Sequence, residues 1–223
     1  MYTQMQKNYY ENEATHWNLG NKNPVVGSFD EHNNFEPYSN LVQGLSGVAL
    51  DFGCGPGRNI VKYAQMFDRI DGVDIAQNNL NNAKMYIESS GITVPNLYVC
   101  NGTDLSNIPS DTYDVVISSI CMQHICVHEI RFGYFQEFLR ILKPGGVISL
   151  QMGFGYPSPS TVAYYDNNWG AQGTNRACDT SIEDPSQLEG DLIKIGFSNF
   201  TYTITQTGPG DCHPNWIFFR ATK

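Results

Sequence analysis

The sequence predicts an α/β fold in which helices cover both faces of a doubly wound, Rossmann-like sheet of seven strands. Strand-like and helix-like hydrophobic periods alternate from residue 47 onward, which is typical of parallel strands joined by helical crossovers. A glycine-rich turn, "GCGPG" at residues 53–57, separates the first strand from the first of these helices. With 223 residues, the chain is long enough to bury the core that such a sheet requires.

The expected strands are short apolar runs bounded by turn residues. They cover residues 47–53, 69–75, 96–100, 113–122, 146–152, 197–207 and 215–222. Apolar residues recur at helical spacing over residues 60–67, 76–89 and 127–142, which indicates helices. A further helix has Asp184 as its N-cap, Pro185 as its first residue and Gln187 as capping-box partner, and Gly196 ends it.

Two regions fall outside this alternation. Residues 1–40 are polar and rich in aromatic residues, and they are expected to form an N-terminal arm or lid on a domain that covers residues 41–223. A long irregular insert is expected after the fifth strand, before the helix that begins near Asp184. The last two strands are joined by "GPGDCHP", at residues 208–214.

Charge and composition exclude several classes of partner. The net charge of −9 and the isoelectric point near 4.9 argue against nucleic acid as a partner, because nucleic-acid binders normally carry a basic stripe. The sequence has neither a signal-peptide pattern nor a membrane-spanning apolar run, so a cytoplasmic protein that does not bind membranes is expected. The six cysteines contain no CxxC pair, so buried reduced thiols and no metal are expected.

The glycine-rich turn is the first candidate binding element. In an open parallel sheet, ligands bind outside the carboxyl ends of the strands, and glycines there let the backbone approach a ligand closely. Gly53, Gly55 and Gly57 give the pattern G-x-G-x-G, and Arg58 stands at the sixth position, where a dinucleotide-binding fingerprint, G-x-G-x-x-G, has a glycine or alanine. The pattern therefore disfavours a dinucleotide.

Two carboxylates at neighbouring strand ends point to a nucleoside. Asp74 ends the second strand, and a carboxylate at this place can accept both hydroxyl groups of a ribose. Asp104, in "NGTDL" after the third strand, could accept from the exocyclic amine of adenine, while Leu105 presents a backbone N–H.

The ordered segments "LDFGCGPGRN", "GVDIA", "NGTDL", "YDVVISSICMQHI" and "LKPGG" resemble the motif series of class I S-adenosylmethionine-dependent methyltransferases, in particular their small-molecule, type 11-like branch. The resemblance covers residues 45–153. It implies a seventh strand that runs antiparallel between the fifth and sixth. The cofactor-binding residues that it implies are Asp51 for the methionine amino group, Gly53 and Gly55 for the methionyl part, Asp74 for the ribose, Ile75, Asp104 and Leu105 for the adenine, and the Ser118 carbonyl for the ammonium.

Candidates for the acceptor side lie at the same edge of the predicted sheet. The loop after the sixth strand presents Asp211 and His213, which are the preferred proton-accepting pair. His124 follows the fourth strand, and its imidazole either faces the substrate or is satisfied by backbone at a helix start. The expected substrate-binding residues are Tyr10, Trp17, Tyr165 and Trp169.

The sequence thus predicts methyl transfer from S-adenosylmethionine to an oxygen or nitrogen atom of a small-molecule acceptor, by a monomer or homodimer. A protein or RNA methyltransferase is one alternative, which the acidic charge disfavours. A non-catalytic module that binds S-adenosylmethionine is another, because the glycine turn, Asp74 and Asp104 all serve binding. A dehydrogenase fits poorly, since the third dinucleotide glycine is missing.

Overall fold

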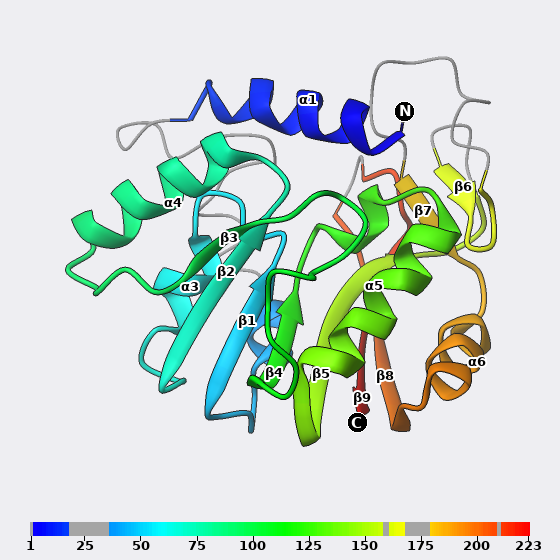
Figure 1. Ribbon diagram of the computed structural model, residues 1–223. Helices are drawn as coiled ribbons and strands as arrows, with labels where there is room; N and C mark the ends of the chain where they lie inside the picture. The colour runs from blue at the N-terminus through cyan, green and yellow to red at the C-terminus, as the bar shows by residue number, and fades with distance from the viewer. Residues whose placement is uncertain (1, 18–35, 158–160, 168–178, 209–210) are drawn as a thin grey trace.

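The computed structural model describes residues 2–17, 36–157, 161–167, 179–208 and 211–223. Within these ranges the strands form one mixed sheet with helices on both faces (Figure 1). The helices and 3-10 turns are α1 (Tyr2–Ala14), η1 (Glu36–Leu41), α3 (Arg58–Tyr63), α4 (Gln77–Ser89), η2 (Met122–His124), α5 (His128–Ile141) and α6 (Pro185–Ile195). The strands are β1 (Val48–Phe52), β2 (Arg69–Asp74), β3 (Leu97–Val99), β4 (Tyr113–Ser118), β5 (Leu142–Phe154), β6 (Thr161–Ala163), β7 (Asp179–Ile182), β8 (Ser198–Gln206) and β9 (Asn215–Thr222).

The order of the main strands confirms the predicted fold class. Strand β1 lies between β2 and β4, β3 adds to β2, β5 adds to β4, and all of these pairs are parallel. Strand β9 is antiparallel and pairs with both β5 and β8. The resulting order β3-β2-β1-β4-β5-β9-β8 is the seven-stranded arrangement with an antiparallel last strand between the fifth and sixth.

The expectation of an irregular insert after β5 is wrong for the part that the structure describes. Strands β6 and β7 form there, pair with each other in parallel, and extend the sheet (Figure 1). Strand β7 pairs with Gly153 and Phe154 of β5, whereas β4 makes its last pair with β5 at Leu150. Because β4 has no residues paired with β5 after Leu150, β7 can pair with the same edge of β5 at Gly153 and Phe154.

Two expected boundaries also differ from the structure. Strand β5 begins at Leu142, directly after α5, rather than beyond Pro144, and the β4–β5 register shifts between Tyr113 and Val115. Strand β4 ends at Ser118, because Ile120 adopts a positive φ of 52° and turns the chain toward η2. The α6 capping box is as predicted, with Asp184 accepting the Ser186 N–H and the Gln187 side chain accepting the Asp184 N–H.

Alternate residues of the central strands fill two separate apolar cores. Leu50 of β1 packs in the core that contains Phe135 and Phe138 of α5, while the adjacent Ala49 packs in the core that contains Ile60 of α3 and Ile87 of α4. These opposed cores hold the sheet rigidly between its helices. None of the helices within the described ranges is both long and apolar enough to cross a membrane.

Helix α1 lies across the carboxyl ends of the parallel strands (Figure 1). It is attached to the start of α4, where Glu11 accepts the backbone N–H groups of Gln77 and Asn78 at 2.8 and 2.9 Å. The Asn82 side chain donates to the carbonyl of Ala14, the last residue of α1, so both attachments lie near the carboxyl end of that helix. Residues 2–17 therefore cover the edge of the sheet where ligands bind in such folds.

Candidate functional site

A cavity of about 1110 Å³, counting its solvent-open part, lies under α1 at the carboxyl ends of β1, β2 and β4. One side of the cavity is formed by the ends of these strands and the glycine turn. Residues of α1 and η2 line the rest of it. The lining residues that carry the following argument are Gly53, Gly55, Arg58, Asp74, Ile75, Ser119, Cys121, His124, Gln6 and Tyr10. Figure 1 shows α1 above the ends of the strands.

The glycine turn follows β1 closely and faces the cavity. Gly53 has a φ of +70°, and a Cβ atom there would lie 2.1 Å from Cys121 Sγ, so only glycine fits. Gly55 also has a positive φ, of +51°, and its N–H donates to Asp74 Oδ2 at 2.9 Å. The turn therefore brings its backbone against the β2 end, as the sequence predicts.

Asp74 is the polar anchor of the cavity floor. Its carboxylate accepts from the Gly55 and Ala76 N–H groups and from Asn79 Nδ2, at 2.9, 2.8 and 3.2 Å. A carboxylate has about four acceptor positions, so about one remains for a ligand hydroxyl in this arrangement. Burial raises the pKa of Asp74, and these three hydrogen bonds oppose the rise. Asp74 thus shapes the turn as well as facing the cavity.

Asp51 is a second buried carboxylate, near the end of β1; it lies outside the cavity lining, to which its neighbours Phe52 and Asn59 belong. It is 1% exposed; Oδ1 accepts from Asn59 Nδ2 at 3.1 Å, and Oδ2 has no hydrogen-bond partner among the described residues. Burial raises its pKa from 3.8 to about 7, while Asn59 and the Arg58 guanidinium lower it. A buried carboxylate oxygen without a donor fits a cationic ligand group such as an ammonium.

Arg58 brings a cation to the same end of the cavity. Its guanidinium donates to Ser119 Oγ at 3.3 Å and lies 5.9 Å from the centre of the Tyr38 ring. Burial lowers its pKa, and Tyr38 and Asp51 oppose that change. A carboxylate ligand group would therefore find a partly desolvated guanidinium within the site.

Of the remaining cofactor candidates, Ile75 lines the cavity, while the structure places Asp104, Leu105 and Ser118 outside the lining. Hydrogen bonds from Asn101 and Ser106 lower the pKa of Asp104 to about 2 and fold its side chain into a local turn. The Leu105 N–H donates to Glu137 Oε2 at 2.9 Å, which leaves it no proton for a ligand. The Ser118 hydroxyl donates to the Phe52 carbonyl.

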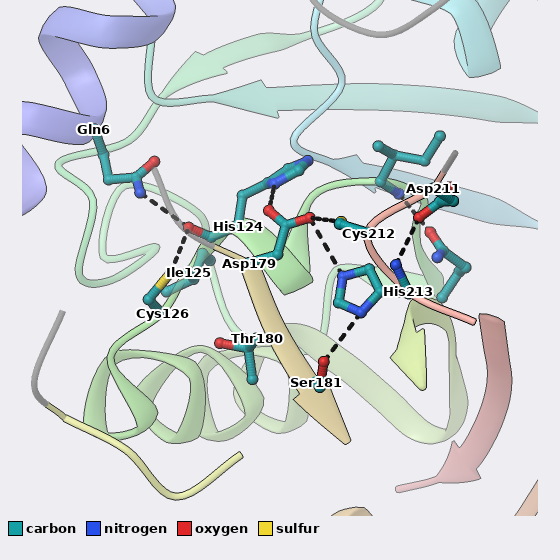
Figure 2. Close-up of polar contacts among 12 residues, drawn as sticks. Gln6, His124, Ile125, Cys126, Asp179, Thr180, Ser181, Asp211, Cys212 and His213 are labelled. Atoms are coloured by element: carbon teal, nitrogen blue, oxygen red, sulfur yellow. Dashed lines mark hydrogen bonds and ion pairs between the residues drawn. The ribbon is translucent and has the colours of Figure 1, made fainter. Parts of the chain in front are cut away.

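His124 faces the cavity from η2, and the structure links it to His213 through Asp179 (Figure 2). His124 Nδ1 lies 2.5 Å from Asp179 Oδ1, and His213 Nε2 lies 3.3 Å from Asp179 Oδ2. Burial would raise the pKa of Asp179, but His124, His213 and Cys212 bring it well below its ordinary value. Asp179 is therefore an ionised carboxylate between two imidazoles.

Asp211 and His213, the expected proton acceptors, do not lie together at the cavity. Asp211 is exposed, and its Oδ1 accepts the backbone N–H of His213 at 2.9 Å rather than contacting the imidazole (Figure 2). The short Asp-x-His spacing favours this local turn, because a side chain reaches the backbone two residues on. The imidazole of His213 is buried, with 1% exposure, and lies outside the cavity lining.

Of the aromatic residues expected to bind substrate, one lines the cavity and two lie outside its lining. Tyr10 lines the cavity, with its ring centre 6.5 Å from that of His124. Trp17 is buried against Tyr86 of α4, away from the lining, and Tyr165 is 52% exposed and packs against the ring of His128. Trp169 lies outside the described residues.

Sequence reasoning missed three residues that shape the site. In the sequence, Arg58 stands out only as a departure from a dinucleotide pattern, although its place at the start of α3 puts it in the cavity lining. Gln6 of α1 donates to the His124 carbonyl, and a local sequence pattern does not predict a contact between residues 118 positions apart. Asp179 begins a strand, "DTSI", whose short length hid it within the insert.

Comparisons with known proteins agree with this geometry. A family model described as a methyltransferase domain matches residues 50–150, which contain the glycine turn, Asp74 and His124. Residues 50–150 are therefore similar in sequence to methyltransferase domains. The match begins in β1 and ends in β5, so it includes the parallel half of the sheet.

Named relatives of the methyltransferase domain act on different kinds of acceptor. Human N-terminal Xaa-Pro-Lys N-methyltransferase 1 is 32% identical over 108 residues, which is 46% of each chain. The ubiquinone biosynthesis O-methyltransferase of Cereibacter sphaeroides is 28% identical over 99 residues, covering 44% of this chain and 38% of that protein. The chain thus matches less than half the length of these relatives.

A solved structure extends the likeness beyond the methyltransferase domain. DhpI, in the DhpI–SAM–HEP complex, is 14% identical and superposes with a TM-score of 0.68 over 98% of this chain and 96% of its own. At this identity the superposition shows a shared fold. That fold includes α1 and the strands after β5, which the family model does not cover.

Proposed function

We propose that this protein transfers the methyl group of S-adenosylmethionine to an oxygen or nitrogen atom of a small-molecule acceptor. The observation that carries the proposal is the cavity under α1. It combines the glycine turn and Asp74 on one side with His124 and Tyr10 on the other. The glycine turn and Asp74 would bind the cofactor, and His124 and Tyr10 would lie beside the acceptor.

The cofactor half provides complementary groups for each part of S-adenosylmethionine. Asp51 Oδ2, which is buried just outside the lining with no donor among the described residues, would accept from the ammonium, and Arg58 would hold the carboxylate. Asp74 would accept from a ribose hydroxyl, and Ile75 would cover the adenine. Because the Leu105 N–H is already donated to Glu137, we assign the adenine edge to the lining around Gly102 instead.

S-adenosylmethionine, when bound, supplies a methyl group already activated by a sulfonium, so the protein mainly aligns the acceptor and excludes water. Helix α1 supports both tasks, since Tyr2 and Gln6 attach it to the His124 carbonyl at 3.0 and 2.9 Å. The cover that α1 places over the cavity favours a small acceptor over a macromolecule. The net charge of −9 also disfavours RNA.

His124 is the imidazole that we place beside the acceptor. It lines the cavity, and Asp179 fixes the orientation of its ring from the opposite side. In this position its ring can take the proton that an acceptor hydroxyl or ammonium must lose. His213 and Asp211 lie outside the lining, so we place them behind Asp179 rather than against the acceptor.

The direct test is methyl transfer from S-adenosylmethionine labelled in its methyl group to a panel of small hydroxyl and amine compounds. We expect saturable transfer to one chemical class, and His124→Asn should lower kcat by about 100-fold or more without weakening cofactor binding. His128→Asn is the matched control, because His128 also pairs with a carboxylate, Asp191, but lies outside the lining. Label found only in protein or RNA from cell extract would contradict the small-molecule acceptor.

A further inference from the structure

Three side chains of metal-binding type meet behind His124, outside the cofactor cavity (Figure 2). Asp179 Oδ2 lies 3.0 Å from Cys212 Sγ and 3.3 Å from His213 Nε2. The three ligand atoms all lie within 4.8 Å of one another. One oxygen, one sulfur and one imidazole nitrogen around a common point is a donor set that tetrahedral zinc accepts.

The other ring nitrogen of His213 is held as in metal-binding histidines. Nδ1 lies 3.1 Å from Ser181 Oγ, and the Ser181 hydroxyl donates its own proton to Thr161 Oγ1. Ser181 Oγ therefore accepts from Nδ1–H, which directs Nε2 toward Asp179 and Cys212. Histidines that bind metals usually donate their second N–H to such a neighbour, which fixes the ring and the tautomer.

We propose that Asp179 Oδ2, Cys212 Sγ and His213 Nε2 bind one divalent transition-metal ion, and that zinc matches this donor set best. Binding forms three coordinate bonds, and the thiol proton of Cys212, with any proton on Nε2, passes to solvent. No electron is transferred. The exposed position of Cys212 gives the ion a path of entry and leaves a fourth position for water.

The ion would connect segments that are far apart in the chain. Asp179 begins β7, and Cys212 and His213 lie in the loop between β8 and β9. Asp179 would bind the ion through Oδ2 and keep Oδ1 on His124 Nδ1, so the ion would sit behind the imidazole of the cavity wall. This places it as a structural support for His124 rather than as a group that contacts the acceptor.

Zinc titration of the full chain, after removal of bound metal with a chelator, tests the proposal without any acceptor. We expect one zinc ion per chain, and at least about tenfold weaker binding in Cys212→Ser and in His213→Asn. Cobalt serves as the optical probe, because a thiolate ligand gives a charge-transfer absorption that Cys212→Ser should abolish. Cys126→Ala is the matched thiol control and should keep both signals, since Cys126 lies in a separate apolar cluster.

Circular dichroism of each variant shows whether it is folded before metal is added. Cys212 is exposed, so its replacement by serine should leave the fold intact even if His213→Asn does not. Zinc should raise the unfolding temperature of the wild-type chain and of Cys126→Ala, but not that of Cys212→Ser. Absence of stoichiometric zinc binding, or equal binding by Cys212→Ser and Cys126→Ala, would overturn the proposal.

Discussion

His124 Nδ1 lies 2.5 Å from Asp179 Oδ1, although 55 positions separate the two residues in the sequence. The contact exists because β4 ends early on the edge of β5, and β7 takes the open edge beside η2. Since Asp179 Oδ2 lies 3.0 Å from Cys212 Sγ and 3.3 Å from His213 Nε2, in the loop between β8 and β9, a single carboxylate joins η2, β7 and that loop. The wall of the cavity is thus supported by a segment that the family model does not cover.

Replacing Asp179 with asparagine should destabilise this junction. In chelator-treated protein, Asp179→Asn should lower the free energy of unfolding by about 1–3 kcal/mol, because the Asp179 carboxylate contacts His124, Cys212 and His213 in a mostly buried place and the variant loses its charge. Asp211→Asn, at an exposed carboxylate, should cost less. Urea unfolding measures both, and equal losses would contradict the role given to Asp179.

The fit of Gly53 against Cys121 can be measured against a glycine with free space. Both Gly53→Ala and Gly145→Ala introduce a Cβ at a positive φ, of +70° and +80°, but only Gly53 faces a neighbour, Cys121 Sγ, at 2.1 Å. Gly145→Ala should cost about 1–2 kcal/mol of stability, and Gly53→Ala about 1–3 kcal/mol more. Cys121 Cβ would also lie only 2.6 Å from the added atom, so the double variant Gly53→Ala/Cys121→Gly should recover part of that excess. No recovery would show that the contact with Cys121 is not the cause.

Asp51 should make cofactor binding depend on pH. Its pKa is raised by burial from 3.8 to about 7, so the folded chain holds a proton there that the unfolded chain has lost between these values. This group therefore makes the free protein less stable as pH rises through that window. An ammonium ligand favours the ionised form, so affinity for S-adenosylmethionine should fall up to about tenfold for each pH unit below about 7.

Calorimetry between about pH 5.5 and pH 8 measures this dependence, and two buffers of different ionisation enthalpy count the protons released. The profile of Asp51→Asn should be flat and its affinity lower at the alkaline end. A wild-type affinity that does not change across the range would contradict the placement of the ammonium at Asp51.

Glu11 should control how firmly α1 covers the cavity. Its carboxylate accepts the N–H groups of Gln77 and Asn78, which have no partner within α4 because they open that helix. Glu11→Ala should cost about 1 kcal/mol and should speed hydrogen exchange of these two amides about fivefold. Glu13→Ala, on the same helix, is the control, and unchanged exchange in Glu11→Ala would show that the contact does not hold α1.

The parts that local sequence signals define were predicted well. The apolar runs and glycine stops located the strands β1, β2, β8 and β9, and the Asp184–Gln187 capping box located α6. The glycine turn and Asp74 also lie in the cavity, as expected, because each follows directly from a strand end in a parallel sheet.

The parts of the site that depend on contacts between distant residues were not predicted from the sequence. Asp179 begins a strand of four residues, too short for periodicity to reveal it, and its partner His124 lies on another element. The backbone N–H of Leu105 matched a motif, yet Glu137 of α5 occupies it, and a linear pattern does not show a competitor 32 residues away. The position of their loop after a strand predicts Asp211 and His213 on the cofactor side, whereas the Asp211 carboxylate accepts the His213 backbone N–H in a local turn.

Calorimetric titration of the purified chain with S-adenosylmethionine and S-adenosylhomocysteine, with Asp74→Ala beside the wild type, tests the central claim most directly. The account predicts saturable binding of one molecule per chain, weakened at least about tenfold in Asp74→Ala, because that variant loses the carboxylate that holds Gly55 and faces the cavity. No binding of either compound by the folded wild type, or equal binding by Asp74→Ala, would contradict it.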